Sequence, residues 1–89
     1  MVEQQIPVVN RLGLHARAAA KLVQLLGRYK SNAVLSCRGR EINAKSIMGV
    51  MLLAAAQGSM VTLRLDGPDE SEAMQAAVEL FAQRFGEAD

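Results

Sequence analysis

The chain has 89 residues, a formal net charge of +1 with its histidine neutral, and a hydrophobic fraction of 51%. This length suits one domain, expected to span residues 1–89, and the hydrophobic fraction is high enough to build a compact core. A net charge so close to zero argues against nucleic-acid binding driven by phosphate contacts.

Cellular location is indicated by three features of the sequence. The N-terminal residues do not have the pattern of a signal peptide, and the longest apolar run, residues 47–56, is too short to cross a bilayer. The lone Cys37 cannot form an internal disulfide, which suits a reducing compartment. We therefore expect a cytoplasmic protein with no membrane insertion.

The first half of the chain predicts a strand, a helix and two further strands. Loose alternation over residues 2–9 predicts a strand, and Pro7 favours a sheet edge because proline has no amide donor. A loop over residues 10–14 precedes a predicted helix over 16–26, which ends at Gly27. Its apolar stripe consists of Ala19, Leu22, Val23 and Leu26. Strands over 32–37 and 41–43 follow, joined by a tight turn at 38–40.

The second half predicts a helix, a strand and a last helix. Ser46 is a typical N-cap for a short helix over residues 47–56, and the alternation of Val61, Leu63 and Leu65 predicts a strand over 60–66. Pro68 suits the first position of a helix that runs to about Phe85, and acidic residues occupy its first turn. The buried side of this helix is expected to hold Met74, Ala77, Phe81 and Phe85. Residues 86–89 are expected to fray.

The predicted order is therefore β-α-β-β-α-β-α, an α+β fold. Two β-α-β segments and one appended helix suit a four-stranded antiparallel sheet with helices covering one face. That arrangement would bury all of the apolar stripes described above.

His15, the only histidine, lies where the first helix is predicted to begin. The first backbone amides of a helix have no partner within the helix, and with the helix dipole they attract anions. The same positive end favours a neutral imidazole, which keeps a nucleophilic lone pair. A phosphoryl group on this ring would meet the amides of Ala16, Arg17 and Ala18, and the side chain of Arg17 could add a charge-assisted contact.

Other interpretations of these residues stay open. A histidine at a helix start is commonly a surface residue or a simple cap. One histidine and one distant cysteine make no metal-ligand set, and Cys37 lies on the apolar face of a predicted strand. No cofactor site is apparent, and a free-standing enzyme is disfavoured because no paired carboxylates or phosphate loop accompany the histidine.

A second predicted helix start, at Ser46, has a related design. Ser46 can simply cap the helix, but a phosphoryl group there would also be tolerated at a helix N-terminus, so its effect would fall on partner surfaces. The helix that follows is apolar nearly all round, and exposed methionines suit adaptable docking surfaces. The alternative is that inward-facing positions such as Val50 and Leu53 account for the pattern and the other apolar side chains are incidental.

Two motifs, Gly13-Leu14-His15-Ala16-Arg17 and Asn43 to Met51, together with Gln57-Gly58, resemble the HPr family. These are the histidine-containing phosphocarrier proteins of the bacterial phosphoenolpyruvate-dependent phosphotransferase system. The resemblance covers essentially the whole chain. It implies an open-faced β-sandwich with strand order 1-4-2-3 and three helices on one face.

The resemblance also implies the following roles. His15 takes a phosphoryl group on Nδ1 from enzyme I and passes it to a IIA component, assisted by Arg17. Ser46 matches the regulatory site of HPr kinase/phosphorylase. The docking surface lies on the first two helices, at Ala20, Ile47, Met48 and Met51. The chain departs from the family at Ala18, where proline is usual.

Two branches of the family remain as alternatives. One feeds sugar permeases, and the other, the nitrogen-related branch, serves a regulatory IIA protein. A purely regulatory binding module is therefore the second hypothesis. In either case we expect a monomer with transient protein partners, no cofactor and no bound metal.

Overall fold

The computed structural model describes residues 1–87. It contains a four-stranded antiparallel sheet in the order β1-β4-β2-β3, as the resemblance implied. The strands are β1 (Val2–Pro7), β2 (Asn32–Cys37), β3 (Arg40–Asn43) and β4 (Met60–Asp66). Pro7 lies on the edge strand β1 and pairs with Met60 of β4. No strand lies on the other side of β1, so the amide that proline lacks is not needed there for a sheet hydrogen bond.

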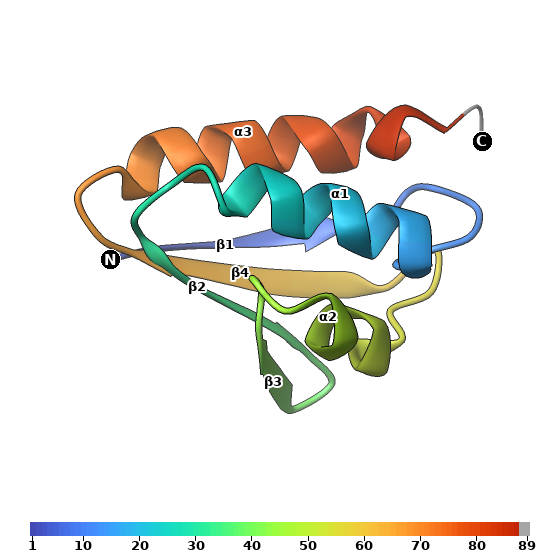
Figure 1. Ribbon diagram of the computed structural model, residues 1–89. Helices are drawn as coiled ribbons and strands as arrows, with labels where there is room; N and C mark the ends of the chain where they lie inside the picture. Colours follow the sequence, from blue (N-terminus) through green and yellow to red (C-terminus); the bar gives the residue numbers. More distant parts are fainter. Residues whose placement is uncertain (88–89) are drawn as a thin grey trace.

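Three α-helices accompany the sheet: α1 (Ala16–Leu26), α2 (Ile47–Leu53) and α3 (Glu70–Ala82). A 3₁₀ turn, η1 (Arg84–Gly86), follows α3. Helices α1 and α3 run side by side over one face of the sheet, while α2 packs against α1 and β3 (Figure 1). The loop before α1 and the turn after α3 lie at the same end of the molecule (Figure 1).

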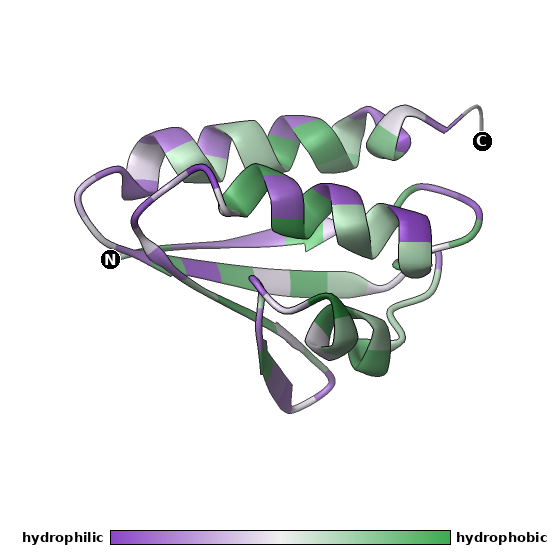
Figure 2. Cartoon of the chain, in the orientation of Figure 1, coloured by the Kyte–Doolittle hydropathy of each residue, from purple (hydrophilic) through white to green (hydrophobic). Residues whose placement is uncertain are grey.

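The core fills the space between the sheet and the helices. The inward side of the central strand β4 supplies Val61, Leu63 and Leu65, all buried. They pack against the expected apolar stripe of α1, in which Ala19, Leu22 and Leu26 are fully buried and Val23 is half-buried. Met74, Ala77, Phe81 and Phe85 are buried as predicted. In Figure 2, hydrophobic residues recur as green segments along these helices and strand β4.

Several predicted boundaries are wrong. The first strand ends at Pro7 rather than at residue 9, and α2 ends at Leu53 rather than at residue 56. Helix α2 stops because Ala54 adopts a left-handed conformation, with φ of +52°.

Helix α3 also differs from expectation at both ends. It begins at Glu70, so Pro68 lies in the preceding turn rather than at the first helical position. It ends at Ala82, and Phe85 is buried from a non-helical turn. The prediction of fraying is wrong for Gly86 and Glu87, which are held by hydrogen bonds; residues 88 and 89 lie outside the described part of the chain.

Candidate functional site

His15 is the N-cap of α1, as the sequence predicted. Its backbone is extended, with φ of −76° and ψ of −179°, and its carbonyl accepts the first helical hydrogen bond from the amide of Ala19 at 2.8 Å. Its ring Nδ1 accepts a hydrogen bond from the backbone N–H of Arg17 at 3.3 Å. The imidazole therefore turns one nitrogen toward the free amides that begin the helix.

The loop before His15 is fixed by a close approach to the segment after α2. Gly13 has φ of +65°, and a Cβ there would lie 2.4 Å from the carbonyl oxygen of Ala55. The next residue, Leu14, is buried and donates its amide to the same oxygen at 2.9 Å. Only glycine fits this backbone and this gap. The Gly-Leu pair thus sets the position from which the His15 side chain extends.

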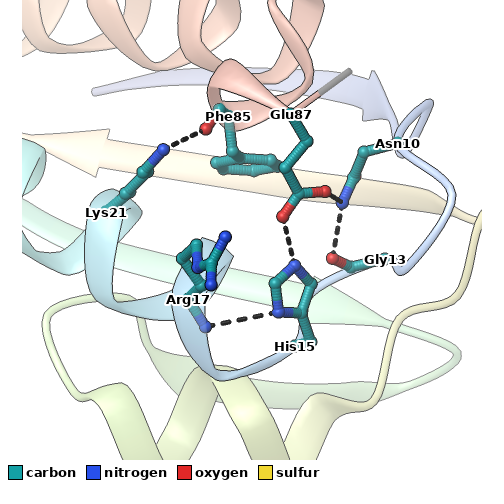
Figure 3. Close-up of polar contacts among 7 residues, drawn as sticks. All are labelled: Asn10, Gly13, His15, Arg17, Lys21, Phe85 and Glu87. Carbon is teal, nitrogen blue, oxygen red and sulfur yellow. Dashed lines mark hydrogen bonds and ion pairs between the residues drawn. The ribbon is translucent and has the colours of Figure 1, made fainter. Parts of the chain in front are cut away.

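The other ring nitrogen of His15, Nε2, makes a hydrogen bond to a carboxylate oxygen, Oε2 of Glu87 (Figure 3). Glu87 lies 72 residues further along the chain. The His15 side chain is 27% exposed and that of Glu87 is 14% exposed. The ring is thus accessible from one side and is contacted by a carboxylate on the other.

Asn10 connects these groups. Its side chain is fully buried, and its Nδ2 donates to the carbonyl of Gly13 at 2.7 Å and to Oε1 of Glu87 at 3.0 Å. Both amide hydrogens have acceptors, so this end of Asn10 must be the nitrogen. Its Oδ1 is buried and has no hydrogen-bond partner within residues 1–87. An unsatisfied buried acceptor costs about 1–3 kcal/mol, which marks Asn10 as a residue under an unusual constraint.

The Glu87 carboxyl is held in its charged form. Burial raises its pKa, but the hydrogen bonds from Asn10 and His15, together with the electrostatic effect of His15 and Arg17, outweigh burial and lower the pKa from its ordinary value. The site thus pairs a ring nitrogen with a carboxylate and leaves the opposite nitrogen beside the helix start.

Ser46 caps α2 as predicted, accepting a hydrogen bond from the amide of Gly49 at 3.1 Å. Helix α2 buries Val50 and Leu53 but exposes Ile47, Met48, Met51 and Leu52. Ala20 on the neighbouring α1 is half-buried. In Figure 2 most of the α2 ribbon is green, the colour of hydrophobic residues.

Other kinds of site find no support among residues 1–87. No group of three or more histidine, cysteine or acidic side chains is placed to hold a metal ion. Cys37 is buried on the sheet, as its strand position predicted. None of the helices in this part of the chain is long and apolar enough to cross a membrane.

Sequence reasoning proposed His15, Arg17 and Ser46 as site residues, which the structure places at the starts of α1 and α2, but it did not single out Asn10 and Glu87. Asn10 was assigned to a loop and Glu87 to a frayed tail. No pattern in the sequence links these residues, because the pairing of Glu87 with His15 depends on how α3 ends and on which end of the sheet it reaches.

The sequence is similar to those of known phosphocarrier proteins. The sequence model described as "PTS HPr component phosphorylation site" matches residues 2–83. The phosphocarrier protein HPr of Xylella fastidiosa (strain Temecula1) is 61% identical over 87 residues, which are 98% of each chain.

Solved structures are also similar. The crystal structure of HPr-C-His from Thermoanaerobacter tengcongensis matches with a TM-score of 0.96 and 43% identity, covering 100% of both chains. The crystal structure of an HPr dimer from the same organism matches with a TM-score of 0.78 and 44% identity, covering 98% of this chain and 100% of that one.

Proposed function

Because the chain belongs to the HPr family of phosphocarrier proteins of the phosphotransferase system, we propose that it accepts a phosphoryl group on His15 from phosphorylated enzyme I and transfers it to a IIA component. The observation that carries this proposal is the position of His15 as N-cap of α1, with Nδ1 at 3.3 Å from the amide nitrogen of Arg17.

The chemistry follows from this geometry. The Nδ1 lone pair forms the new N–P bond while the bond between phosphorus and the donor histidine breaks, its electron pair going to the donor. The incoming negative charge then lies beside the amides of Ala16, Arg17 and Ala18, at the positive end of the helix dipole. The exposed guanidinium of Arg17 adds a charge-assisted contact.

In this role the protein is a phosphoryl carrier that is itself modified, rather than an enzyme that turns over a small molecule. It works in the cytoplasm without a cofactor, a metal or nucleic acid. Enzyme I and the IIA component dock on α1 and α2, over Ala20 and the exposed apolar side chains Ile47, Met48 and Met51. We propose a monomer that meets these partners transiently; a similar protein crystallised as a dimer, so light scattering of the purified protein is the check.

The second candidate function is regulatory binding controlled by Ser46. The observation that favours it is that Ser46 caps α2 directly beside Ile47, which is 42% exposed. Phosphorylation by HPr kinase/phosphorylase would add about two negative charges there. The helix N-terminus tolerates that charge, so partner affinity changes rather than the fold. The output of such a protein would be regulation, with or without sugar uptake.

Intact-mass measurement after two separate incubations tests both functions. Phosphoenolpyruvate with enzyme I should give an acid-labile adduct of one phosphoryl group, absent in His15→Ala. ATP with HPr kinase should give an acid-stable adduct, absent in Ser46→Ala. No adduct in the first incubation, with an enzyme I shown to be active, would refute the carrier function.

A further inference from the structure

The backbone of the turn that follows α3 adopts an energetically unfavourable conformation. Arg84, Phe85 and Gly86 all have positive φ, of 55°, 55° and 78°. Two of these three are not glycine, and residues with a Cβ rarely adopt this conformation. Such a segment persists only where its surroundings hold it, and strain of this kind is concentrated at functional sites.

The surroundings hold this turn at several points. The Phe85 ring is fully buried and packs edge-on against Phe81, with ring centroids 4.9 Å apart. The carbonyl of Phe85 accepts a hydrogen bond from Nζ of Lys21 on α1 (Figure 3). The amide of Glu87 donates to the carbonyl of Arg84 at 2.9 Å. The position of Glu87 is therefore fixed by the buried Phe85 ring and by the hydrogen bond from α1, the helix that His15 caps.

The Glu87 side chain is oriented as well as positioned. One carboxylate oxygen accepts from the buried amide of Asn10, and the other faces Nε2 of His15. A carboxylate only accepts hydrogen bonds, so Nε2 carries the ring proton. Nδ1 is then the unprotonated nitrogen, and its lone pair accepts the hydrogen bond from the Arg17 amide.

We infer that Glu87 is a positioning residue for phosphoryl transfer, which holds His15 in the tautomer protonated at Nε2 and pairs with the positive charge that the ring gains when Nδ1 is phosphorylated. The inference rests on the proposed function, since it concerns the same histidine. The buried Asn10 and the turn of residues 84–86 keep the carboxylate in place.

The charge that the His15 ring gains during transfer explains why a carboxylate beside Nε2 is useful. When the Nδ1 lone pair forms its bond to phosphorus, no proton leaves His15, so the ring carries a positive charge with Nε2–H still in place. Glu87 stabilises this charge from the side of the ring opposite to the phosphoryl group. On transfer to the next acceptor, the N–P bond breaks and its electron pair returns to Nδ1, which restores the neutral ring in the same tautomer. A carboxylate behind an imidazole has this role in serine hydrolases.

The test compares Glu87→Gln with a matched control, Glu79→Gln, which makes the same charge change at an exposed position on α3. The first readout is the tautomer of His15 in the unphosphorylated protein at alkaline pH, from the ¹⁵N chemical shifts of both ring nitrogens. It does not depend on any partner. The second readout is the rate of phosphoryl transfer from phosphorylated enzyme I, with circular dichroism to establish that both variants are folded.

We expect the Nδ1–H tautomer to become populated in Glu87→Gln and the transfer rate to fall by about tenfold, which is the lower end of the loss seen when the partner that orients a metal-binding histidine is removed. Glu79→Gln should match the wild type in both readouts. Glu87→Asp, which keeps the carboxylate on a shorter side chain, should recover part of the rate.

A transfer rate for Glu87→Gln within twofold of the wild type would overturn the inference, as would an unchanged tautomer or an equal loss in Glu79→Gln. Each of these results would leave the proposed function standing. A wild-type protein that is never phosphorylated by active enzyme I would instead overturn the proposed function, and the inference about transfer with it.

Discussion

Leu22→Ala tests how much the buried stripe of α1, the helix that His15 caps, contributes to the stability of the fold. Leu22 has no exposed surface and lies in the middle of the helix that His15 caps. Its neighbours in the core include Ala18 and Ala19 of the preceding turn, both fully buried. Truncation at this position removes apolar contacts and leaves a cavity between α1 and the sheet.

The expected loss of stability has two parts. The three carbon atoms removed are worth about 2.4 kcal/mol at roughly 0.8 kcal/mol each. The cavity adds to this, and buried leucine-to-alanine changes cost about 2–5 kcal/mol in total. We therefore expect the free energy of unfolding to fall by about 3 kcal/mol, and Tm to fall by roughly 4–8 °C for each of those kcal/mol.

Urea unfolding followed by circular dichroism measures this change. The matched control is Leu52→Ala, since Leu52 is also helical but 65% exposed, and its effect should stay within about 0.5 kcal/mol. A loss below about 1 kcal/mol in Leu22→Ala, or equal losses in the two variants, would mean that the buried stripe of α1 is misassigned.

Three other changes probe the loop before α1, the helix start and the turn before α3. Gly13→Ala should be strongly destabilising and should slow phosphorylation of His15, because its Cβ would lie 2.4 Å from the carbonyl oxygen of Ala55. Thermal melts measure the stability and the enzyme I assay measures the phosphorylation rate. Wild-type values in both would contradict the close approach. Ala18→Pro removes one of the three amides that face the phosphoryl group but should keep phosphoryl acceptance, because that amide is not needed within the helix and those of Ala16 and Arg17 remain. A folded variant that accepts no phosphoryl group would contradict this. Asp69→Asn should lower stability at pH 7, because the Ser31 hydroxyl and the Lys30 and Ser31 amides, which donate to this carboxylate, lower its pKa from the ordinary 3.8. A lowered pKa stabilises the fold above the pKa of the unfolded chain and is lost as pH falls through the folded value, so the difference from wild type should shrink below about pH 4 in urea melts; a difference constant with pH would refute it.

Local patterns in the sequence determined most of the elements. Two-residue alternation identified β2 and β4 at their observed bounds, and the apolar stripe did the same for α1. Caps with a local mechanism were also readable: Ser46 accepts from Gly49, three residues away, so both partners lie within one turn of helix. The strand order was implied by the family resemblance rather than by periodicity.

The ends of the elements were less predictable because they depend on contacts from elsewhere. Good helix formers continue in the sequence as far as Ala56, yet α2 ends at Leu53. The carbonyl of Ala55 instead accepts a hydrogen bond from the amide of Leu14. Helix α3 stops before Phe85 because that ring is buried from a left-handed turn beside Phe81. In both places tertiary packing outweighs helix propensity.

For the site, the sequence by itself determined that a lone histidine begins a helix, with an arginine in the first turn and a serine capping the next helix. Those facts are local, because a cap and its amides are neighbours in the chain. Only the tertiary structure decided what lies behind the imidazole. Glu87 meets His15 across 72 residues, held by a buried Asn10 and a strained turn. Glu87 belongs to no repeating sequence pattern that could predict its partner. Its contact with His15 forms only because α3 packs across the sheet and ends near the start of α1.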